Sequence, residues 1–273
     1  LVQTLQQQFV ADWEARAGQP ADGDVAVQLL QQRIHSLQRA GQLPLAGLGQ
    51  REAQQLQDSV LPGLQAWQRV RAAYPQAAPR QRLHLVHGGA VLEDWLDPLW
   101  LPASPVPGGL PLWLLLDPRD VRDSKGQVRR DRLLPVYIRS VVAAACGVEV
   151  QGTVIGRDAS LHVQAMPQAL AQQALQDLLA LWQQGMNEPL PLPYKTGLAL
   201  AAPMGDMQAA ASAYEGGFKH HGECEDMSWQ RLFADFAALT EDGQLPGLAQ
   251  MVYVPLHAWC DSCVQVVCEG QVV

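Results

Sequence analysis

The cationic side chains of the chain are concentrated in one stretch that has the composition of a phosphate-binding site. Seven of its 19 lysines and arginines fall within 21 positions: Arg119, Arg122, Lys125, Arg129, Arg130, Arg132 and Arg139. Only three acidic residues share the stretch: Asp120, Asp123 and Asp131. Clustered arginines can hold a phosphate backbone through their charge and their paired N–H donors. The stretch therefore predicts a nucleic-acid contact. The alternative is a solvated loop and helix start whose charges pair with one another.

Cysteines near the end of the chain have the spacing of a metal site. Cys260 and Cys263 are separated by two residues. The further candidate ligands are Cys268, Cys146, Cys224, His257, His220 and His221. Thiolates alone would favour an iron–sulfur cluster, and added histidines would favour zinc. Three clustered thiols do not complete a four-ligand site, and residues 264–267 are typical of ordinary core or terminal chain. We therefore expect free thiols and no metal.

The tryptophans offer a second kind of nucleic-acid contact, base stacking. Trp95, Trp100 and Trp113 flank a predicted strand pair and a proline-rich loop, where one or two could stack on a base. Core packing is the better explanation for most of them. Three others, which lie at helical core positions, are Trp13, Trp67 and Trp182.

Composition bounds what such sites could do. The 273 residues are 48% hydrophobic, enough to bury a substantial core, and the formal net charge is −8. A nucleic-acid contact on so acidic a chain must be a local patch. No apolar run approaches the length of a membrane helix, and the five scattered cysteines favour reduced thiols. We expect a cytoplasmic fragment of a longer protein, since the chain begins at Leu1 without a methionine.

The elements that must position these residues begin with a helical lead-in over residues 1–78. Val27, Leu30, Ile34 and Leu37 have helical spacing and Gly41 is a stop signal. A second helix is predicted over residues 50–74, bent or broken around Pro62.

Strands and helices alternate from residue 79 onward. Residues 83–87 and 91–96 predict a hairpin with its turn at Gly88-Gly89. Further strands are predicted over residues 112–116, 148–155 and 161–164, and helices over 131–145 and from Pro167. The latter helix carries a predicted core-facing stripe: Leu170, Ala174, Leu178 and Trp182. An extended connector is predicted over 187–193, followed by helices over 207–214, 228–239 and 245–260.

Three segments resemble signatures of the carboxy-terminal region of the gamma subunit (RecC) of exodeoxyribonuclease V. They are AGQLPLAGLG at 40–49, EPLPLPYKTGLA at 188–199, and YEGGF, GECED and WQRLFADF within 214–236. The resemblance implies a heterotrimer with the motor subunits RecB and RecD, which use ATP and magnesium. In that complex the gamma subunit helps to split the duplex, channels single strands and takes part in recognising the Chi sequence. No Gly-x-x-x-x-Gly-Lys-Ser/Thr loop occurs in this chain, in agreement with motors on other subunits.

The resemblance also implies a fold like that of PD-(D/E)xK nucleases, with the cutting residues lost. Active relatives hold a metal between acids on two strands, with a lysine two residues after the second. Asp97 and Asp117 match the two acids, but Arg119 replaces the lysine and stays protonated at all useful pH values. The helix glutamine is replaced by Leu133, and Pro118 removes a backbone donor. These positions are interpreted as vestigial.

We therefore expect an α/β domain over residues 79–273, with a nuclease-like mixed sheet flanked by helices, after the lead-in of residues 1–78. The expected function is non-catalytic strand guidance, duplex splitting and subunit assembly in double-strand break repair, with no cofactor in this domain. DNA would be bound through Arg119, Arg122, Lys125, Arg129, Arg130 and Arg132. One alternative is a residual magnesium-dependent nuclease using Asp97 and Asp117, and another is a protein scaffold that never meets DNA. Contact with a sister subunit would use the same charges as contact with DNA.

Overall fold

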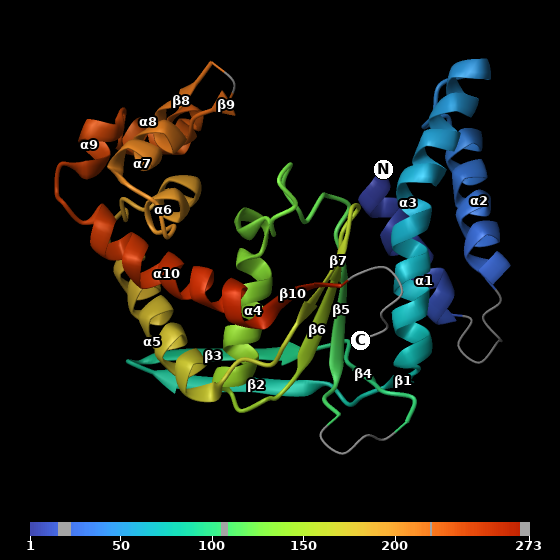
Figure 1. Ribbon diagram of the computed structural model, residues 1–273, viewed down its shortest axis with the longest axis horizontal. Helices are drawn as coiled ribbons and strands as arrows, with labels where there is room; N and C mark the ends of the chain where they lie inside the picture. The colour runs from blue at the N-terminus through green and yellow to red at the C-terminus, as the bar shows by residue number, and fades with distance from the viewer. Residues whose placement is uncertain (16–22, 105–108, 219, 268–273) are drawn as a thin grey trace.

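A six-stranded sheet lies between two sets of helices (Figure 1), in a computed structural model that describes residues 1–15, 23–104, 109–218 and 220–267. One set is the lead-in: α1 (Val2–Ala15), α2 (Gly23–Arg39) and α3 (Ala46–Ala73). The other set is α4 (Leu134–Ala145), α5 (Gln168–Gly185) and α10 (Leu245–Cys263). The expected class, a mixed α/β sheet flanked by helices after a helical lead-in, is confirmed.

The sheet has the order β1-β4-β5-β6-β7-β10 and is mixed. Its strands are β1 (Gln76–Ala77), β4 (Trp100–Leu101), β5 (Leu112–Leu116), β6 (Gln151–Ile155), β7 (Ser160–Val163) and β10 (Val264–Val267). Only β5 and β6 are parallel, and a long connection containing α4 joins them, as parallel pairing requires. Residues 264–267, interpreted as ordinary core or terminal chain, pair with β7 as the sixth strand, and Val264 lies in the hydrophobic core.

The predicted hairpin is confirmed, but it does not belong to the six-stranded sheet. Strands β2 (Gln81–His87) and β3 (Ala90–Leu96) pair only with each other. Gly88 and Gly89 both have positive φ, +56° and +82°, which is the conformation of a two-residue hairpin turn. The inner face of the hairpin carries Leu83 and Leu96, which are buried in the core shared with α4 and α5.

The lead-in packs on the sheet face opposite α4. Helix α3 runs without interruption through Pro62, so the predicted break is wrong. Ile155 of β6 lies in the same core as Phe9 and Leu64. A Cβ atom on Gly63 would lie 3.9 Å from Ile155, an ordinary van der Waals distance, so the approach of α3 to the sheet does not require glycine at this position. The proposed division between residues 78 and 79 stays a prediction.

The stripe predicted for α5 is wrong at both ends. Leu170 is 63% exposed and Trp182 is 57% exposed, whereas Ala171, Leu175 and Leu181 are buried. Successive i, i+4 steps each advance about 40° around a helix, so residues 170 and 182 lie about 120° apart. A strict i+4 series therefore leaves the core-facing side within a few turns.

A close approach fixes the alignment of the two parallel strands. Trp113 of β5 is paired in register with Gly152 of β6 and is almost fully buried. A Cβ atom at position 152 would lie 1.9 Å from the Trp113 ring. Only glycine leaves room for the indole there.

After α6 (Tyr194–Leu200) the chain forms a projecting unit, residues 201–245, which we call the arm (Figure 1). It contains α7 (Met207–Glu215), β8 (Gly216–Gly217), β9 (His220–His221), the 3-10 turn Glu223–Glu225, α8 (Met227–Leu232) and α9 (Phe236–Thr240). A small core of its own includes Tyr214, Leu239 and Leu245. The single helix predicted over residues 228–239 is two helices, because Asp235 accepts a hydrogen bond from Ala238 N at 2.8 Å and starts a new one.

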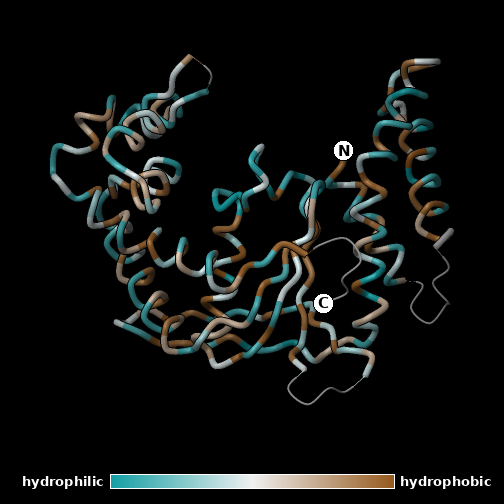
Figure 2. The backbone as a smooth tube through the Cα atoms, in the orientation of Figure 1, coloured by the Kyte–Doolittle hydropathy of each residue, from teal (hydrophilic) through white to brown (hydrophobic). Residues whose placement is uncertain are grey.

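Hydrophobic and hydrophilic residues are mixed along each helix (Figure 2). Among the described residues no helix combines the length and the apolar character needed to cross a membrane.

Candidate functional site

The acid that follows β5 is held by its neighbouring arginine. Asp117 is 9% exposed. Its Oδ1 accepts hydrogen bonds from the backbone N and the Nε of Arg119, both at 2.9 Å, and its Oδ2 accepts one from Nη2 at 2.7 Å. Burial alone raises the pKa of the Asp117 carboxyl, but the hydrogen bonds and charge of Arg119 outweigh burial and hold the pKa below its usual value. Both carboxylate oxygens are thus committed to a guanidinium.

The other vestigial acid lies on a different part of the fold. Asp97 follows β3, whose strand belongs to the separate hairpin, and it is exposed. In the six-stranded sheet the neighbours of β5 are β4 and β6, so β3 does not lie beside the strand that precedes Asp117. Leu133, at the position of the missing glutamine, is buried in the core. Residues 1–15, 23–104, 109–218 and 220–267 contain no group of three or more His, Cys, Asp or Glu suited to a metal ion. The residues present therefore do not fit the metal that active relatives of this fold hold.

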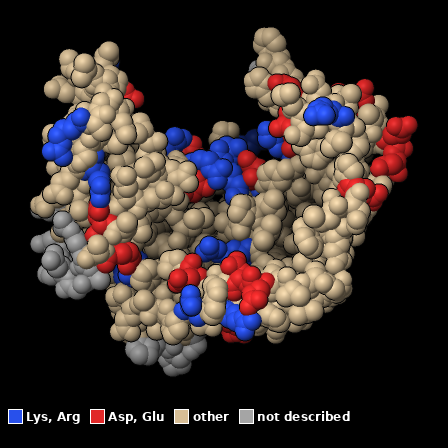
Figure 3. All heavy atoms as spheres, turned by 180° about the vertical axis from the view of Figure 1, so that it is seen from behind, with Lys and Arg blue, Asp and Glu red and all other residues tan. Residues whose placement is uncertain are grey.

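We call residues 119–132, without Arg139, the basic segment. It forms the connection from β5 to α4, which rises between the arm and the lead-in (Figure 1). Figure 3 shows lysine and arginine side chains mixed with acidic ones in the hollowed middle of the opposite view. Arg139 does not join them, since it lies on α4 with its guanidinium 5.7 Å from the Trp113 ring, and burial lowers its pKa.

Most arginines of the basic segment are paired with carboxylates. Arg122 pairs with Asp158 at 3.2 Å, and Arg129 pairs with Asp131 at 3.0 Å. Asp120 has two further arginine contacts, one through its side chain and one through its backbone carbonyl. Arg157 binds Asp120 through its Nε at 2.7 Å, and Arg132 donates to the carbonyl oxygen of Asp120 at 2.6 Å.

Arg130 joins the basic segment to helix α10. It forms an ion pair with Asp261, and its Nη1 lies 3.0 Å from Nδ1 of the buried His257. Arginine can only donate, so Nδ1 accepts, and Nε2 carries the proton that it donates to the carbonyl oxygen of Leu198 at 3.1 Å. Arg130 is therefore part of the packing between elements as well as of the charged surface.

The six residues predicted to bind DNA thus lie on one segment, and the five arginines among them have hydrogen-bond partners within the protein. Lys125 lies exposed on the turn within a bridge between Arg122 and Val128. The partners Asp158, Arg157, Asp261 and His257 were missed from the sequence. They are distant along the chain, and no local pattern connects them to the segment.

The cysteine prediction is only partly covered by the described residues. Cys260 and Cys263 lie buried in the last turns of α10. Burial raises the pKa of the Cys260 thiol to about 12, which disfavours the thiolate that a metal requires. Cys268 lies outside the described residues.

Of the three tryptophans considered for stacking, two are buried. Trp100 and Trp113 are core residues, and the guanidinium of Arg71 lies 3.3 Å from the Trp100 ring. Trp95 is partly exposed, with the guanidinium of Arg80 4.1 Å from its ring. Core packing is therefore the correct interpretation for Trp100 and Trp113.

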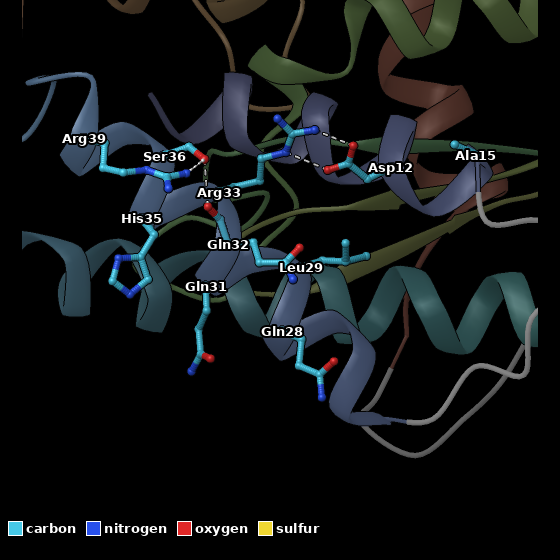
Figure 4. A pocket seen from close by; sticks show the side chains of 10 residues that line it. All are labelled: Asp12, Ala15, Gln28, Leu29, Gln31, Gln32, Arg33, His35, Ser36 and Arg39. Carbon is cyan, nitrogen blue, oxygen red and sulfur yellow. Dashed lines mark hydrogen bonds and ion pairs between the residues drawn. The ribbon is translucent and has the colours of Figure 1, made fainter.

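An open groove of about 840 Å³ lies between α1 and α2 (Figure 4). Its lining is mainly polar, with several glutamines and the ion pair of Arg33 with Asp12. It is built from the lead-in and includes no residue of the basic segment.

Comparison with known families gives one clear result. The family model described as the RecC C-terminal domain matches residues 3–204, about three quarters of the chain. No curated protein matches the chain. The matched region contains the lead-in, the hairpin, the basic segment and most of the sheet, which accounts for the signatures found at 40–49 and 188–199. The chain therefore belongs to the RecC C-terminal domain family, whose members have a role in the RecBCD complex of recombination repair.

Proposed function

We propose that this domain is a non-catalytic, strand-guiding part of exodeoxyribonuclease V that acts in double-strand break repair in the cytoplasm. Its partners would be RecB-like and RecD-like motor subunits, which supply the ATP- and magnesium-dependent chemistry, and the DNA ends and single strands that they process. The proposal that the domain is non-catalytic rests on Asp117, whose two carboxylate oxygens both accept hydrogen bonds from Arg119.

The positively charged guanidinium of Arg119, bound to the Asp117 carboxylate, repels a divalent cation from that site. A metal needs lone pairs on carboxylate oxygens, and here the paired N–H donors of Arg119 already occupy both oxygens. Arg119 remains cationic, so it cannot vacate the acid by losing a proton. Asp97 offers no second ligand on an adjacent strand.

Contact with DNA is supported by the basic segment and its setting. The side chain of Arg157 is more than half exposed in its ion pair with Asp120 of the basic segment. Exposed pairs of this kind contribute about 0–1 kcal/mol each, so phosphates that accept the same paired N–H donors can displace the carboxylates. The hollow between arm and lead-in gives a strand a place to lie (Figure 3).

The scaffold alternative has one specific observation in its favour. Arg119, Arg122, Arg129 and Arg130 each have a carboxylate partner within the chain, so the segment presents less positive charge than its sequence implies. If these pairs are permanent, the segment is a structural connector.

Fluorescence anisotropy with a forked duplex separates the two. The Lys125→Glu/Arg122→Gln variant should bind several-fold more weakly, and binding should fall steeply with salt, because phosphate contacts release counterions. The matched control is Arg51→Glu/Arg69→Gln, at exposed positions on α3, which changes the net charge by the same amount. Arg130 is a poor target because it also holds His257. Binding that ignores both salt and the double substitution would favour the scaffold.

The residual nuclease is tested separately. Incubation of labelled DNA with magnesium should give no cleavage by the domain itself. Cleavage that disappears on chelation and in Asp97→Ala would refute the non-catalytic proposal.

A further inference from the structure

The arm carries most of the net negative charge of the chain. Residues 201–245 contain eight acids against two cations, Lys219 and Arg231, whereas the whole chain has a net charge of −8. The acids are Asp206, Glu215, Glu223, Glu225, Asp226, Asp235, Glu241 and Asp242.

Most of these carboxylates accept hydrogen bonds from backbone N–H groups, which do not neutralise their charge. Asp206 accepts from Ala209 N at 2.7 Å and Asp226 accepts from Ser228 N at 2.8 Å, as helix caps. Glu223 likewise accepts from backbone N–H groups of α6. Within the described part of the arm, the one ion pair joins Glu225 to His221. A backbone N–H donor fixes the position of a carboxylate but carries no formal charge, so the net negative charge of the arm is not reduced.

Large apolar side chains project from the same unit. Phe218 at the end of β8 is fully exposed, Met204 is 94% exposed and Met227 is 76% exposed. Leu232 and Met207 are also exposed. Single exposed apolar residues are ordinary, but five within 29 positions on a small projecting unit indicate an interaction surface. Methionine is common on such surfaces because its flexible side chain adapts to a partner.

The charge of the arm decides which partner fits. DNA is repelled by a net negative unit, and so is a second copy of this chain, because its arm carries the same charge. A protein segment with lysine or arginine flanking apolar side chains satisfies both features of the surface. We propose that the arm is a docking surface for a basic, amphipathic segment of a partner protein in the assembly.

This inference rests on the proposed assembly with the motor subunits but is independent of strand guidance. It concerns residues 201–245, nearly all of which lie beyond the region matched by the family model. The basic segment and the arm belong to different elements and can be substituted separately.

The test uses the full subunit assembled with its two motor subunits. A photoreactive benzoylphenylalanine replaces Phe218 in one sample and Met227 in another, with Gln55, exposed on α3, as the control position. Irradiation should join the arm positions to one lysine- or arginine-rich peptide of a motor subunit, and the control should not give that product. Products with DNA, with a second copy, or with no partner at all would overturn the proposal.

A binding measurement complements the cross-link. Phe218→Ser/Glu241→Lys should weaken association with the cross-linked motor subunit by about 30-fold, the smallest loss that defines an interface hot spot. Met186→Ser/Glu52→Lys, also at exposed positions, is the matched control and should leave association unchanged. Forked-duplex binding by the arm variant should equal that of the unsubstituted protein. Unchanged association of a folded arm variant, checked by circular dichroism, would refute the docking surface and leave strand guidance unaffected.

Discussion

Most charged side chains of the basic segment are paired with other charged side chains, whereas most acids of the arm accept hydrogen bonds from backbone N–H groups. Arg122 and Arg129 are each paired with a carboxylate, but Asp206 and Asp235 each cap a helix. The first arrangement cancels charge and the second preserves it. The charge that a ligand meets is therefore smaller than the sequence count in the basic segment and close to the sequence count in the arm.

The largest expected effect of this difference is on stability, at an arm carboxylate. Glu223 accepts hydrogen bonds from Lys195 N, Thr196 N and Thr196 Oγ1 at 2.7–2.8 Å, and Thr196 is fully buried. Glu223→Ala should lower the free energy of unfolding by about 2–3 kcal/mol, because these donors lose a charged acceptor. Urea denaturation measures the loss, and hydrogen exchange at Lys195 and Thr196 should accelerate.

A graded control sharpens this prediction. Glu223→Gln keeps one acceptor oxygen and should lose less than Glu223→Ala. A loss from Glu223→Ala no larger than that of the surface change Glu52→Ala, within about 0.5 kcal/mol, would show that the backbone contacts of the arm are not important for stability.

A smaller effect is expected at the buried acid of the basic segment. Because Arg119 holds the pKa of Asp117 below its usual value, the pair adds stability above the unfolded pKa of about 4, and this is lost as pH falls through the folded pKa. Arg119→Gln should cost about 1 kcal/mol at pH 7. The gap between the two proteins in denaturant titrations should close in acid. A gap that stays constant down to pH 2 would contradict the pairing.

The smallest effect is on DNA affinity and rests on strand guidance. Asp120 competes with phosphate for Arg157, so Asp120→Asn should raise affinity for single-stranded DNA by about two- to fivefold in anisotropy titrations. Glu241→Gln removes the same charge from the arm and should change affinity less. Equal effects would mean that net charge, not the local pair, governs binding.

Local signals predicted much of the fold. The hairpin followed from Gly88-Gly89, because few other residues accept positive φ twice in succession. Strand β5 was predicted over its observed residues from a short apolar run. Helix α3 was predicted, but its predicted break at Pro62 was wrong, because packing on the sheet overrode the local signal of the proline. The α5 stripe was wrong at its ends because an i+4 series drifts around a helix.

The candidate site was less accessible to sequence reasoning. That Asp117 and Arg119 form a closed pair is a local fact, since only Pro118 lies between them. That Arg130 binds Asp261 depends on where α10 crosses the segment, 131 positions away. The separation of β3 from the main sheet, which leaves Asp97 off the strand beside β5, likewise depends on tertiary pairing.

The contact between Trp113 and Gly152 has a consequence for relatives of this chain. Since the indole occupies the volume of a Cβ atom, the two positions cannot vary independently. A homologue that carries alanine or valine at the second position should carry a smaller residue at the first. Such paired exchange across β5 and β6 would identify members that keep this sheet even where the acids and arginines have diverged.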